Sequence, residues 1–218
     1  MAVNHPGVTA MNPLDIASHG PVIPVIVIDR LEDALPLARA LLEGGVKVLE
    51  VTLRTAAGLP AIEAIARHLP EAVVGVGTVL NADDARRASE AGARFAVSPG
   101  YTSEVGSACK SLRLPLLPGV STSGEIMMAL ADGLSFLKLF PAGAVGGIPL
   151  LKSWASPFGQ VTFCPTGGIN TTNAPRYLEL PNVRCVGGSW LTTAQAVREG
   201  NWALITQLAR ETHTLRAV

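Results

Sequence analysis

The sequence has few charged and few aromatic residues. Of its 218 residues, 16% are Asp, Glu, Lys or Arg and 5% are aromatic, against 48% hydrophobic residues. Globular chains average about 25% charged residues, so the surface must carry unusually little charge. Two interpretations are open: a large apolar core, as parallel strands buried on both faces require, and a surface partly covered by partner subunits.

Other absences exclude several partners and locations. The formal net charge is zero with no basic cluster, which argues against nucleic acid as a partner. No apolar run reaches about 18 residues and no basic start precedes an apolar stretch, so we expect neither a membrane partner nor a secretory signal. The three cysteines lie far apart without a Cys-x-x-Cys spacing, as expected of free thiols in the reducing cytoplasm.

The usual signatures of metal and nucleotide chemistry are also missing. The four histidines are scattered, and none falls at the end of a predicted strand, so a metal-dependent aldolase or hydrolase would lack its ligands. The sequence has no P-loop, no complete dinucleotide fingerprint after a strand and no G-x-S-x-G nucleophile motif. We therefore expect chemistry that needs no metal ion and no cofactor.

Short apolar runs alternate with amphipathic segments along the chain. Strands that alternate with helices form parallel sheets, so the pattern predicts an α/β fold. Eight strands within 218 residues favour a single-domain (β/α)₈ TIM barrel over residues 1–218, with an open doubly wound sheet as the alternative. The predicted strands are residues 22–28, 46–51, 73–76, 94–97, 115–117, 136–139, 161–163 and 184–186, and the predicted helices are residues 31–43, 60–68, 82–91, 103–111, 123–131, 148–155, 173–178 and 193–212.

Helix termini support this segmentation. Gly92 and Gly133 follow predicted helices, a position at which glycine commonly ends a helix. Residues 12–18 are expected to form a short helix that caps the bottom of the barrel. The predicted N-caps are Asn81, Ser121 or Ser123, and Asn170.

A lysine interrupts the apolar strand predicted at residues 136–139. Side chains alternate along a strand, so Lys138 shares a face with Phe136 and Phe140, while leucines occupy the other face. The leucine face suits packing against helices, which turns Lys138 into the barrel near the carboxyl end of its strand, where barrel active sites lie. A desolvated amine there is a usable nucleophile. The structural alternative is a lysine that reaches out of the barrel or neutralises a carboxylate.

Glu50 is predicted to face inward from another strand. It shares a face with Val48 and Thr52, which places a carboxylate where it can act as a general acid and base. The alternative is a structural ion pair with Lys138 or Arg54. Burial favours a neutral lysine and a nearby carboxylate favours a charged one, so the two groups are expected to titrate as a coupled pair.

Further candidates lie where predicted strands become loops. A guanidinium at Arg54 can hold a carboxylate through two hydrogen bonds, with an ordinary loop arginine as the alternative. Thr78 is a candidate hydrogen-bond donor to a substrate carboxylate, and Pro99 is expected to shape the pocket. Residues 75–78 and 118–122 are interpreted as turns that line the barrel mouth.

Two glycine-rich segments follow the seventh and eighth predicted strands, at residues 165–170 and 186–190. Glycines let backbone N–H groups approach an anion, and the loops at these two places in (β/α)₈ barrels frequently bind phosphate. Either glycine pair alone is also typical of a tight turn, so the predicted phosphate site depends on both.

Motifs at successive strand ends resemble the 2-keto-3-deoxy-6-phosphogluconate (KDPG) aldolases, a family that includes 4-hydroxy-2-oxoglutarate aldolase activity. The likeness runs from about Gly20 to the C-terminal helix. Residues 143–145 depart from it, since family members often carry Glu and Asn there, which leaves the contacts of that loop open. The motifs are residues 46–55, 75–80, 96–100, 117–122, 136–142, 163–169 and 186–191.

The resemblance implies a homotrimeric, metal-independent class I aldolase of the Entner–Doudoroff pathway. Its substrate would be a phosphorylated keto acid, 2-dehydro-3-deoxy-6-phosphogluconate, cleaved to pyruvate and D-glyceraldehyde 3-phosphate. By position, Lys138 resembles the Schiff-base lysine and Glu50 the acid/base. The resemblance further implies carboxylate binding by Arg54 and Thr78, pocket walls at Pro99 and Phe140, and phosphate binding by Thr166, Gly167, Gly168 and Ser189.

Two other functions stay open. A related keto acid, either the 6-phosphogalactonate epimer or unphosphorylated 4-hydroxy-2-oxoglutarate, would keep the lysine chemistry and change the substrate. A phosphate-binding barrel isomerase or a non-catalytic binder would need no lysine imine, and fold alone does not exclude it.

Overall fold

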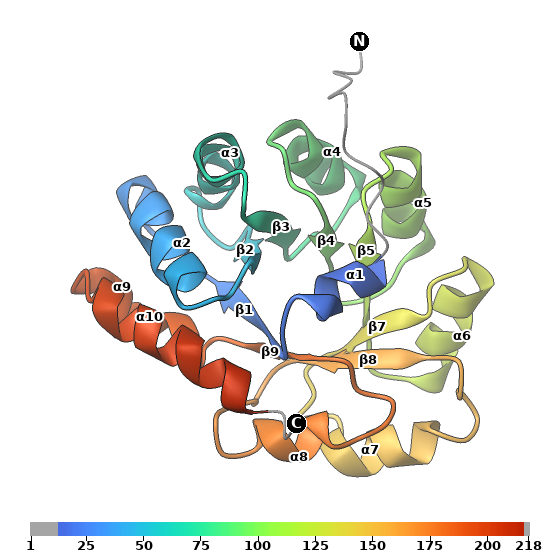
Figure 1. The fold of residues 1–218 in the computed structure, drawn as a ribbon. Helices are drawn as coiled ribbons and strands as arrows, with labels where there is room; N and C mark the ends of the chain where they lie inside the picture. Colours follow the sequence, from blue (N-terminus) through green and yellow to red (C-terminus); the bar gives the residue numbers. More distant parts are fainter. Residues whose placement is uncertain (1–12, 216–218) are drawn as a thin grey trace.

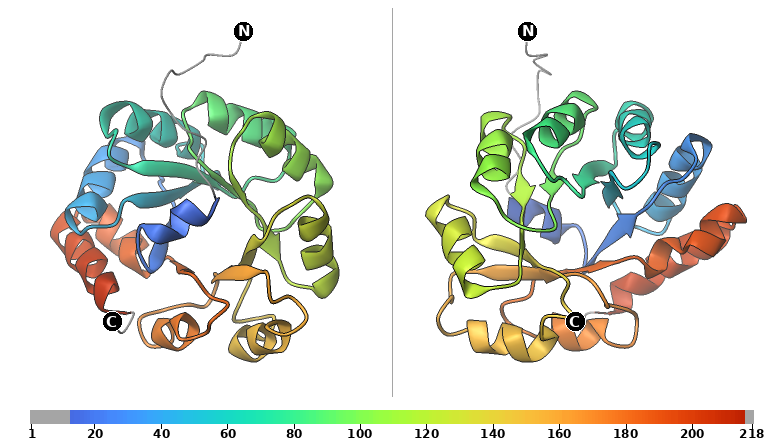
Figure 2. Two further views of the ribbon diagram at one scale, coloured as in Figure 1. Left: turned by 45° about the vertical axis from the view of Figure 1, so that its right-hand side comes forward. Right: turned by 180° about the vertical axis from the view of Figure 1, so that it is seen from behind.

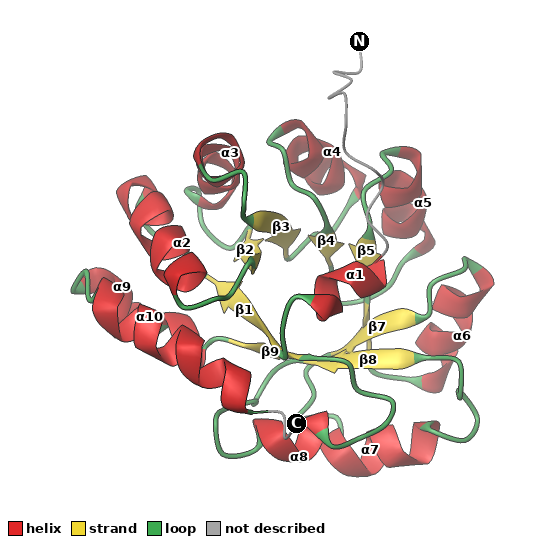
Figure 3. Ribbon diagram, viewed as in Figure 1, coloured by secondary structure: helices red, strands yellow, loops and turns green. Residues whose placement is uncertain are grey.

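The computed structural model describes residues 13–215, and strands alternate with helices along this range (Figure 1). Figure 3 shows the strands in yellow near the centre and the helices in red around them. The strands are β1 Val22–Ile26, β2 Val48–Thr52, β3 Val73–Gly77, β4 Ala96–Val97, β5 Leu116–Leu117, β6 Gly119–Val120, β7 Phe136–Leu139, β8 Thr162–Pro165 and β9 Val186–Gly188. The α-helices are α1 Pro13–Ser18, α2 Ala34–Glu43, α3 Gly58–His68, α4 Ala82–Glu90, α5 Ser103–Ser111, α6 Ser123–Ala131, α7 Gly147–Trp154, α8 Ala174–Leu178, α9 Ala194–Arg198 and α10 Trp202–Glu211.

The strands form two parallel sheets. One sheet has the order β5-β4-β3-β2-β1-β9 and the other the order β6-β7-β8. Two views show the longer helices on the outer side of the curled strands (Figure 2), whereas a doubly wound sheet carries helices on both faces. The α/β prediction with parallel strands is therefore confirmed.

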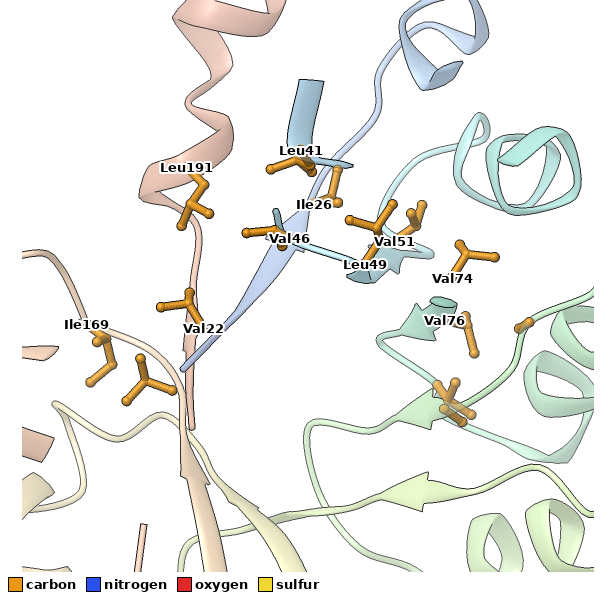
Figure 4. Packing of buried hydrophobic residues seen from close by; sticks show 14 of the residues in the cluster. Val22, Ile26, Leu41, Val46, Leu49, Val51, Val74, Val76, Ile169 and Leu191 are labelled. Carbon is orange, nitrogen blue, oxygen red and sulfur yellow. The ribbon is translucent and has the colours of Figure 1, made fainter. Parts of the chain in front are cut away.

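Two hydrophobic layers follow the two faces of the strands. On β7, Phe136 belongs to the inner layer, while Leu137 and Leu139 belong to the layer between strands and helices. On β2, Val48 lies in the inner layer and Leu49 in the outer one. Figure 4 shows part of the outer layer, in which strand residues pack against Leu41 of α2. The predicted alternation of faces on both strands is confirmed.

The chain's first described helix contributes to the inner layer. Ile16 of α1 is 1% exposed and packs in the cluster that contains Ile23 and Phe95. The short helix predicted at residues 12–18 is therefore present from Pro13, and residue 12 lies outside the described residues. No helix within residues 13–215 combines the length and the apolar character needed to cross a membrane.

The single long helix predicted at residues 193–212 is wrong. The structure has two helices there, α9 and α10, separated at Gly200, whose φ of +62° lies in the left-handed region. Glycine adopts this conformation at little cost, and the side chain of Asn201 then accepts a hydrogen bond from the Leu204 amide at 3.1 Å to cap α10. The apolar periodicity of the two helices conceals this break.

The predicted helix caps are partly correct. Asn81 caps α4 through a hydrogen bond from the Asp84 amide. The cap of α6 is neither Ser121 nor Ser123 but Thr122, which forms a capping box with Glu125. Asn170 does not cap α8; its side chain accepts hydrogen bonds in the turn before it, and Asn173 occupies the N-cap position.

Candidate active site

A buried ion pair lies between β7 and β2. Lys138 Nζ donates a hydrogen bond to Glu50 Oε1 at 3.4 Å, and the two residues are 4% and 2% exposed. Both side chains therefore face the inside of the curled strands, as the alternation predicted, although 88 residues separate them in the chain. Of the two partners proposed for Glu50 from the sequence, the structure shows Lys138.

The neighbours of Lys138 explain how a lysine is accommodated inside. Its register partners are the small residues Gly119 on β6 and Cys164 on β8. The Phe140 ring centroid lies 5.0 Å from Nζ, within the range of a cation–π contact. Burying a charge is costly unless it is paired, and here the carboxylate of Glu50 and the aromatic ring supply that pairing.

Arg54 and Thr78, both predicted to bind a carboxylate, lie together. Arg54 follows β2, Thr78 follows β3, and Arg54 Nε donates to Thr78 Oγ1 at 3.3 Å. Thr78 has a φ of 65°, which is rare for a β-branched residue. The left-handed backbone turns the chain where β3 ends and brings the hydroxyl to the guanidinium of the adjacent strand end.

Pro99 lies next to the strand that pairs with Lys138. Its carbonyl oxygen would be 2.2 Å from a Cβ atom on Gly119, the register partner of Lys138. This close approach places the end of β4 against β6 and keeps Pro99 near the lysine's strand. Gly119 and Val120 form β6, so the interpretation of residues 118–122 as a turn is wrong in part.

The glycine pair after β8 forms a loop that requires glycine. Gly167 and Gly168 have φ values of +96° and +77°, which side chains larger than hydrogen disfavour. Thr166 before them is 5% exposed, and its hydroxyl donates to the Cys164 carbonyl at 3.3 Å. The Gly143 amide donates to the Gly167 carbonyl at 2.9 Å, so the unusual loop at residues 143–145 begins beside this glycine loop.

The glycine pair at residues 187 and 188 is required for a different reason. Gly187 and Gly188 lie in β9 and have no positive φ. A Cβ on Gly187 would lie 2.1 Å from the Thr166 hydroxyl, and one on Gly188 would lie 1.8 Å from the Trp190 ring. The prediction of a loop at these two glycines is therefore wrong, because they belong to a strand and make room for neighbouring side chains.

A cavity of about 590 Å³ joins two of the candidate segments. Its lining includes Arg54 and Ser189, together with Arg30 and Trp190, but neither Lys138 nor Glu50. Arg30 was missed in the sequence; it holds Asp33 through bonds of 2.9 and 2.8 Å. A second cavity of about 330 Å³ contains none of the candidate residues. Within the described range, no three His, Cys, Asp or Glu side chains are grouped to hold a metal ion.

The fold and this geometry are those of an enzyme that forms a covalent imine between a lysine and its substrate. A lysine amine held beside a carboxylate, inside curled parallel strands and close to their carboxyl ends, is what covalent catalysis through an imine requires. The comparisons with known proteins agree. The family model for KDPG and KHG aldolases matches residues 15–208.

Individual relatives are similar over nearly their full length. The KHG/KDPG aldolase of Escherichia coli is 52% identical over 196 residues, covering 90% of this chain and 92% of that protein. The KDPG aldolase of Legionella pneumophila, whose crystal structure holds pyruvate as a covalent carbinolamine, has a TM-score of 0.92 and 49% identity, with 93% and 98% of the chains covered. The KDPG aldolase of Zymomonas mobilis with 3-phosphoglycerate has a TM-score of 0.89 and 49% identity, with 94% and 97% covered. This chain belongs to the KDPG and KHG aldolase family.

Proposed function

We propose that this protein is a class I aldolase of the Entner–Doudoroff pathway that cleaves 2-dehydro-3-deoxy-6-phosphogluconate to pyruvate and D-glyceraldehyde 3-phosphate. It also cleaves 4-hydroxy-2-oxoglutarate. The observation that carries the proposal is the buried Lys138–Glu50 pair. The carbinolamine of pyruvate in the Legionella relative supports an amine nucleophile, because a carbinolamine forms when an amine adds to a carbonyl.

The reaction begins when the Lys138 ammonium transfers a proton to Glu50 and the resulting amine attacks C2 of the keto acid. Glu50 transfers protons so that the carbinolamine loses water and becomes an iminium ion. Glu50 then takes the proton of the C4 hydroxyl, the C3–C4 bond breaks with release of D-glyceraldehyde 3-phosphate, and the electrons of that bond move into the iminium to give an enamine. Protonation at C3 and hydrolysis release pyruvate and the free lysine. The protonated imine is the electron sink, so the reaction requires no metal ion and no cofactor.

The remaining candidate residues bind the two ends of the substrate. Arg54 and Thr78 hold the carboxylate, and their contact with each other presents a guanidinium and a hydroxyl at one place. Phe140 and Pro99 form walls beside Lys138. The phosphate lies at the other end, where the glycine loop after β8 and the hydroxyl of Ser189 converge; the proposed phosphate ligands are Thr166, Gly167, Gly168 and Ser189.

The proposal also covers the closure of the barrel, the role of α1 and the oligomeric state. Only Pro118 separates β5 from β6, and bridges Phe163–Val183 and Thr166–Gly187 link β8 to the segment of β9. Counting β5 and β6 as one strand gives a single-domain, closed (β/α)₈ barrel. The buried Ile16 of α1 supports a capping role for that helix at the end opposite the site. We further propose a cytoplasmic homotrimer, which sedimentation at micromolar concentration tests; a monomer there would refute the trimer.

Borohydride reduction in the presence of pyruvate tests the chemistry. Reduction of the imine should leave a stable three-carbon adduct on Lys138, located by peptide mass spectrometry. Lys138→Arg should abolish the adduct, whereas Lys152→Arg, at an exposed position, should retain it. A wild-type protein without an adduct would show that the mechanism is wrong. Full turnover by Lys138→Arg would instead favour a barrel isomerase.

The substrate is tested by comparing kcat/KM. The phosphorylated keto acid, its galactonate epimer and unphosphorylated 4-hydroxy-2-oxoglutarate should be ranked in that order, because the glycine loop provides amides for a phosphate. Equal kcat/KM with and without the phosphate would contradict the assignment of Gly167, Gly168 and Ser189.

A further inference from the structure

Gly77 of β3 faces the carboxylate of Glu50. It follows Val73 and Gly75 on the inward face of its strand, and its register partner is Thr52 on β2. A Cβ atom on Gly77 would lie 2.4 Å from Glu50 Oε1, 2.8 Å from Cγ and 3.0 Å from Cδ. The space that a side chain would fill is thus occupied by the end of the Glu50 side chain.

The oxygen nearest to Gly77 is the one that binds the lysine. Glu50 Oε1 accepts the hydrogen bond from Lys138 Nζ at 3.4 Å. The carboxylate is therefore enclosed by Lys138 on one side and by the bare backbone of Gly77 on another. Because Glu50 is 2% exposed, it cannot move into solvent to escape an added methyl group.

Backbone conformation does not explain this glycine. Gly77 has no positive φ, in contrast to Gly167 and Gly168, so an alanine would be sterically allowed by the backbone alone. Gly75, two residues earlier, has a different neighbour, since its Cβ would lie 2.3 Å from the Phe95 ring. Of the two inward glycines of β3, Gly75 thus accommodates a core ring and Gly77 accommodates the carboxylate.

We propose that Gly77 is a positioning residue for the aldol reaction, whose missing side chain holds the Glu50 carboxylate against the Lys138 amine. The proposal depends on the function proposed above, because it assigns Gly77 to the proton transfers of Glu50. Gly77 has no side chain that could take part in the reaction, and it acts through Glu50.

The structure sets the size of the effect. Ordinary van der Waals contact begins at 3.4 Å, so an oxygen 2.4 Å from the new Cβ must move by about 1 Å in Gly77→Ala. A misplacement of about 1 Å in a catalytic group lowers rates by roughly a hundredfold. We expect kcat to fall by about that factor, and pyruvate trapping by borohydride to slow in parallel. KM should change little, because the carboxylate and phosphate ligands are left in place.

The matched control is Gly159→Ala. Gly159 is exposed, and its Cβ would meet only the Ala155 carbonyl at 3.7 Å, an ordinary contact. This variant should retain wild-type kcat and KM. Unchanged kcat in Gly77→Ala, with wild-type protein that traps pyruvate, would overturn the positioning role and leave the aldolase proposal intact. Wild-type protein that traps no pyruvate would instead refute the function itself.

Shortening the glutamate provides the rescue. Glu50→Asp retracts the carboxylate by one methylene, so it should lower kcat in the wild type but raise it in the Gly77→Ala background. Equal losses in the two backgrounds would contradict a clash between the two residues.

A variant without the carboxylate covers the case in which Gly77→Ala fails to fold. The double variant Glu50→Ala/Gly77→Ala should unfold in urea at the same midpoint as Glu50→Ala, because the clashing group is gone. A double variant that is unfolded while Glu50→Ala is folded would show that the methyl group conflicts with something other than Glu50, and the proposal would fall.

Discussion

The buried Lys138–Glu50 pair should make the fold sensitive to the loss of either charge. At a separation of 3.4 Å and an effective dielectric constant of about 20, the attraction between unit charges is about 5 kcal/mol. Lys138→Met or Glu50→Leu removes this attraction and leaves the other group buried without its partner. We expect each single variant to lower the free energy of unfolding by about 3–5 kcal/mol, a large share of the about 5–15 kcal/mol available to a domain.

Removing both charges should be far less costly. In the double variant Lys138→Met/Glu50→Leu no charge is left buried, so its free energy of unfolding should equal or exceed that of the wild type. Urea denaturation at pH 7, followed by circular dichroism and tryptophan fluorescence, yields the coupling energy from a double-mutant cycle. A double variant that loses the sum of the two single losses would show that the side chains do not interact as a charged pair.

An exposed ion pair provides the control. Arg86 binds Asp83 at 2.6 Å and Glu90 at 2.8 Å, both shorter than the buried contact, but its side chain is 51% exposed. Solvent screens such pairs, so Arg86→Met should not change the free energy of unfolding measurably. A loss as large as that of Lys138→Met would show that distance, and not burial, governs these ion pairs.

Three further predictions concern other parts of the chain. Ser189→Ala should raise KM for the phosphorylated substrate by roughly tenfold or more, as loss of a charge-assisted hydrogen bond does, and leave kinetics with 4-hydroxy-2-oxoglutarate unchanged; equal effects on both would contradict phosphate binding by Ser189. Burial opposes ionisation of Glu125, but hydrogen bonds from Ser121 and Thr122 outweigh it and lower the pKa of this carboxyl below 4.5. Its contribution to stability is then present above pH 4.5 and is lost as pH falls through the lowered pKa. Glu125→Gln should therefore lower the free energy of unfolding by about 1 kcal/mol at pH 7. In a plot of the urea midpoint against pH, this variant should show a smaller decrease at acid pH than the wild type; an equal decrease would contradict this prediction. Burial raises the pKa of the Cys109 thiol to about 11, so a disulfide reagent at pH 8 should label it only after unfolding in urea; rapid labelling of the native protein would refute its burial.

The sequence alone was sufficient to orient the side chains of the strands. Leucines on either side of Lys138, and Leu49 and Val51 around Glu50, needed the helices to cover them, so the polar residues between them had to face inward. The structure confirms both orientations. This prediction succeeded because it depends only on a period of two along a strand, which local sequence contains.

The sequence did not reveal which distant groups meet. Lys138 and Glu50 are 88 residues apart, and their contact depends on the curl of the strands, which no local pattern specifies. Arg30 was not a candidate because a loop arginine has no signature in the sequence, and only the structure shows that it lines the same cavity as Ser189. The break at Gly200 was hidden because α9 and α10 each bury an apolar face.

Glycine is the residue whose role the sequence shows least clearly, because a glycine can serve either a backbone conformation or a close neighbour. Knowing which face of a strand a glycine lies on helps to distinguish these two roles. The pairs at 167–168 and 187–188 look alike, but the first is required by positive φ and the second by neighbouring side chains. A protein interior has fixed volume and is close-packed, so a large polar side chain that points inward needs an adjacent strand with no side chain at that level. An inward glycine beside an inward polar residue on the next strand therefore indicates a functional site, even before the group that the polar residue contacts is known. Gly77 shows this arrangement with Glu50 of β2, whereas Gly119 makes room for the backbone of Pro99 and Gly187 for the side chain of Thr166, both beyond the end of a strand.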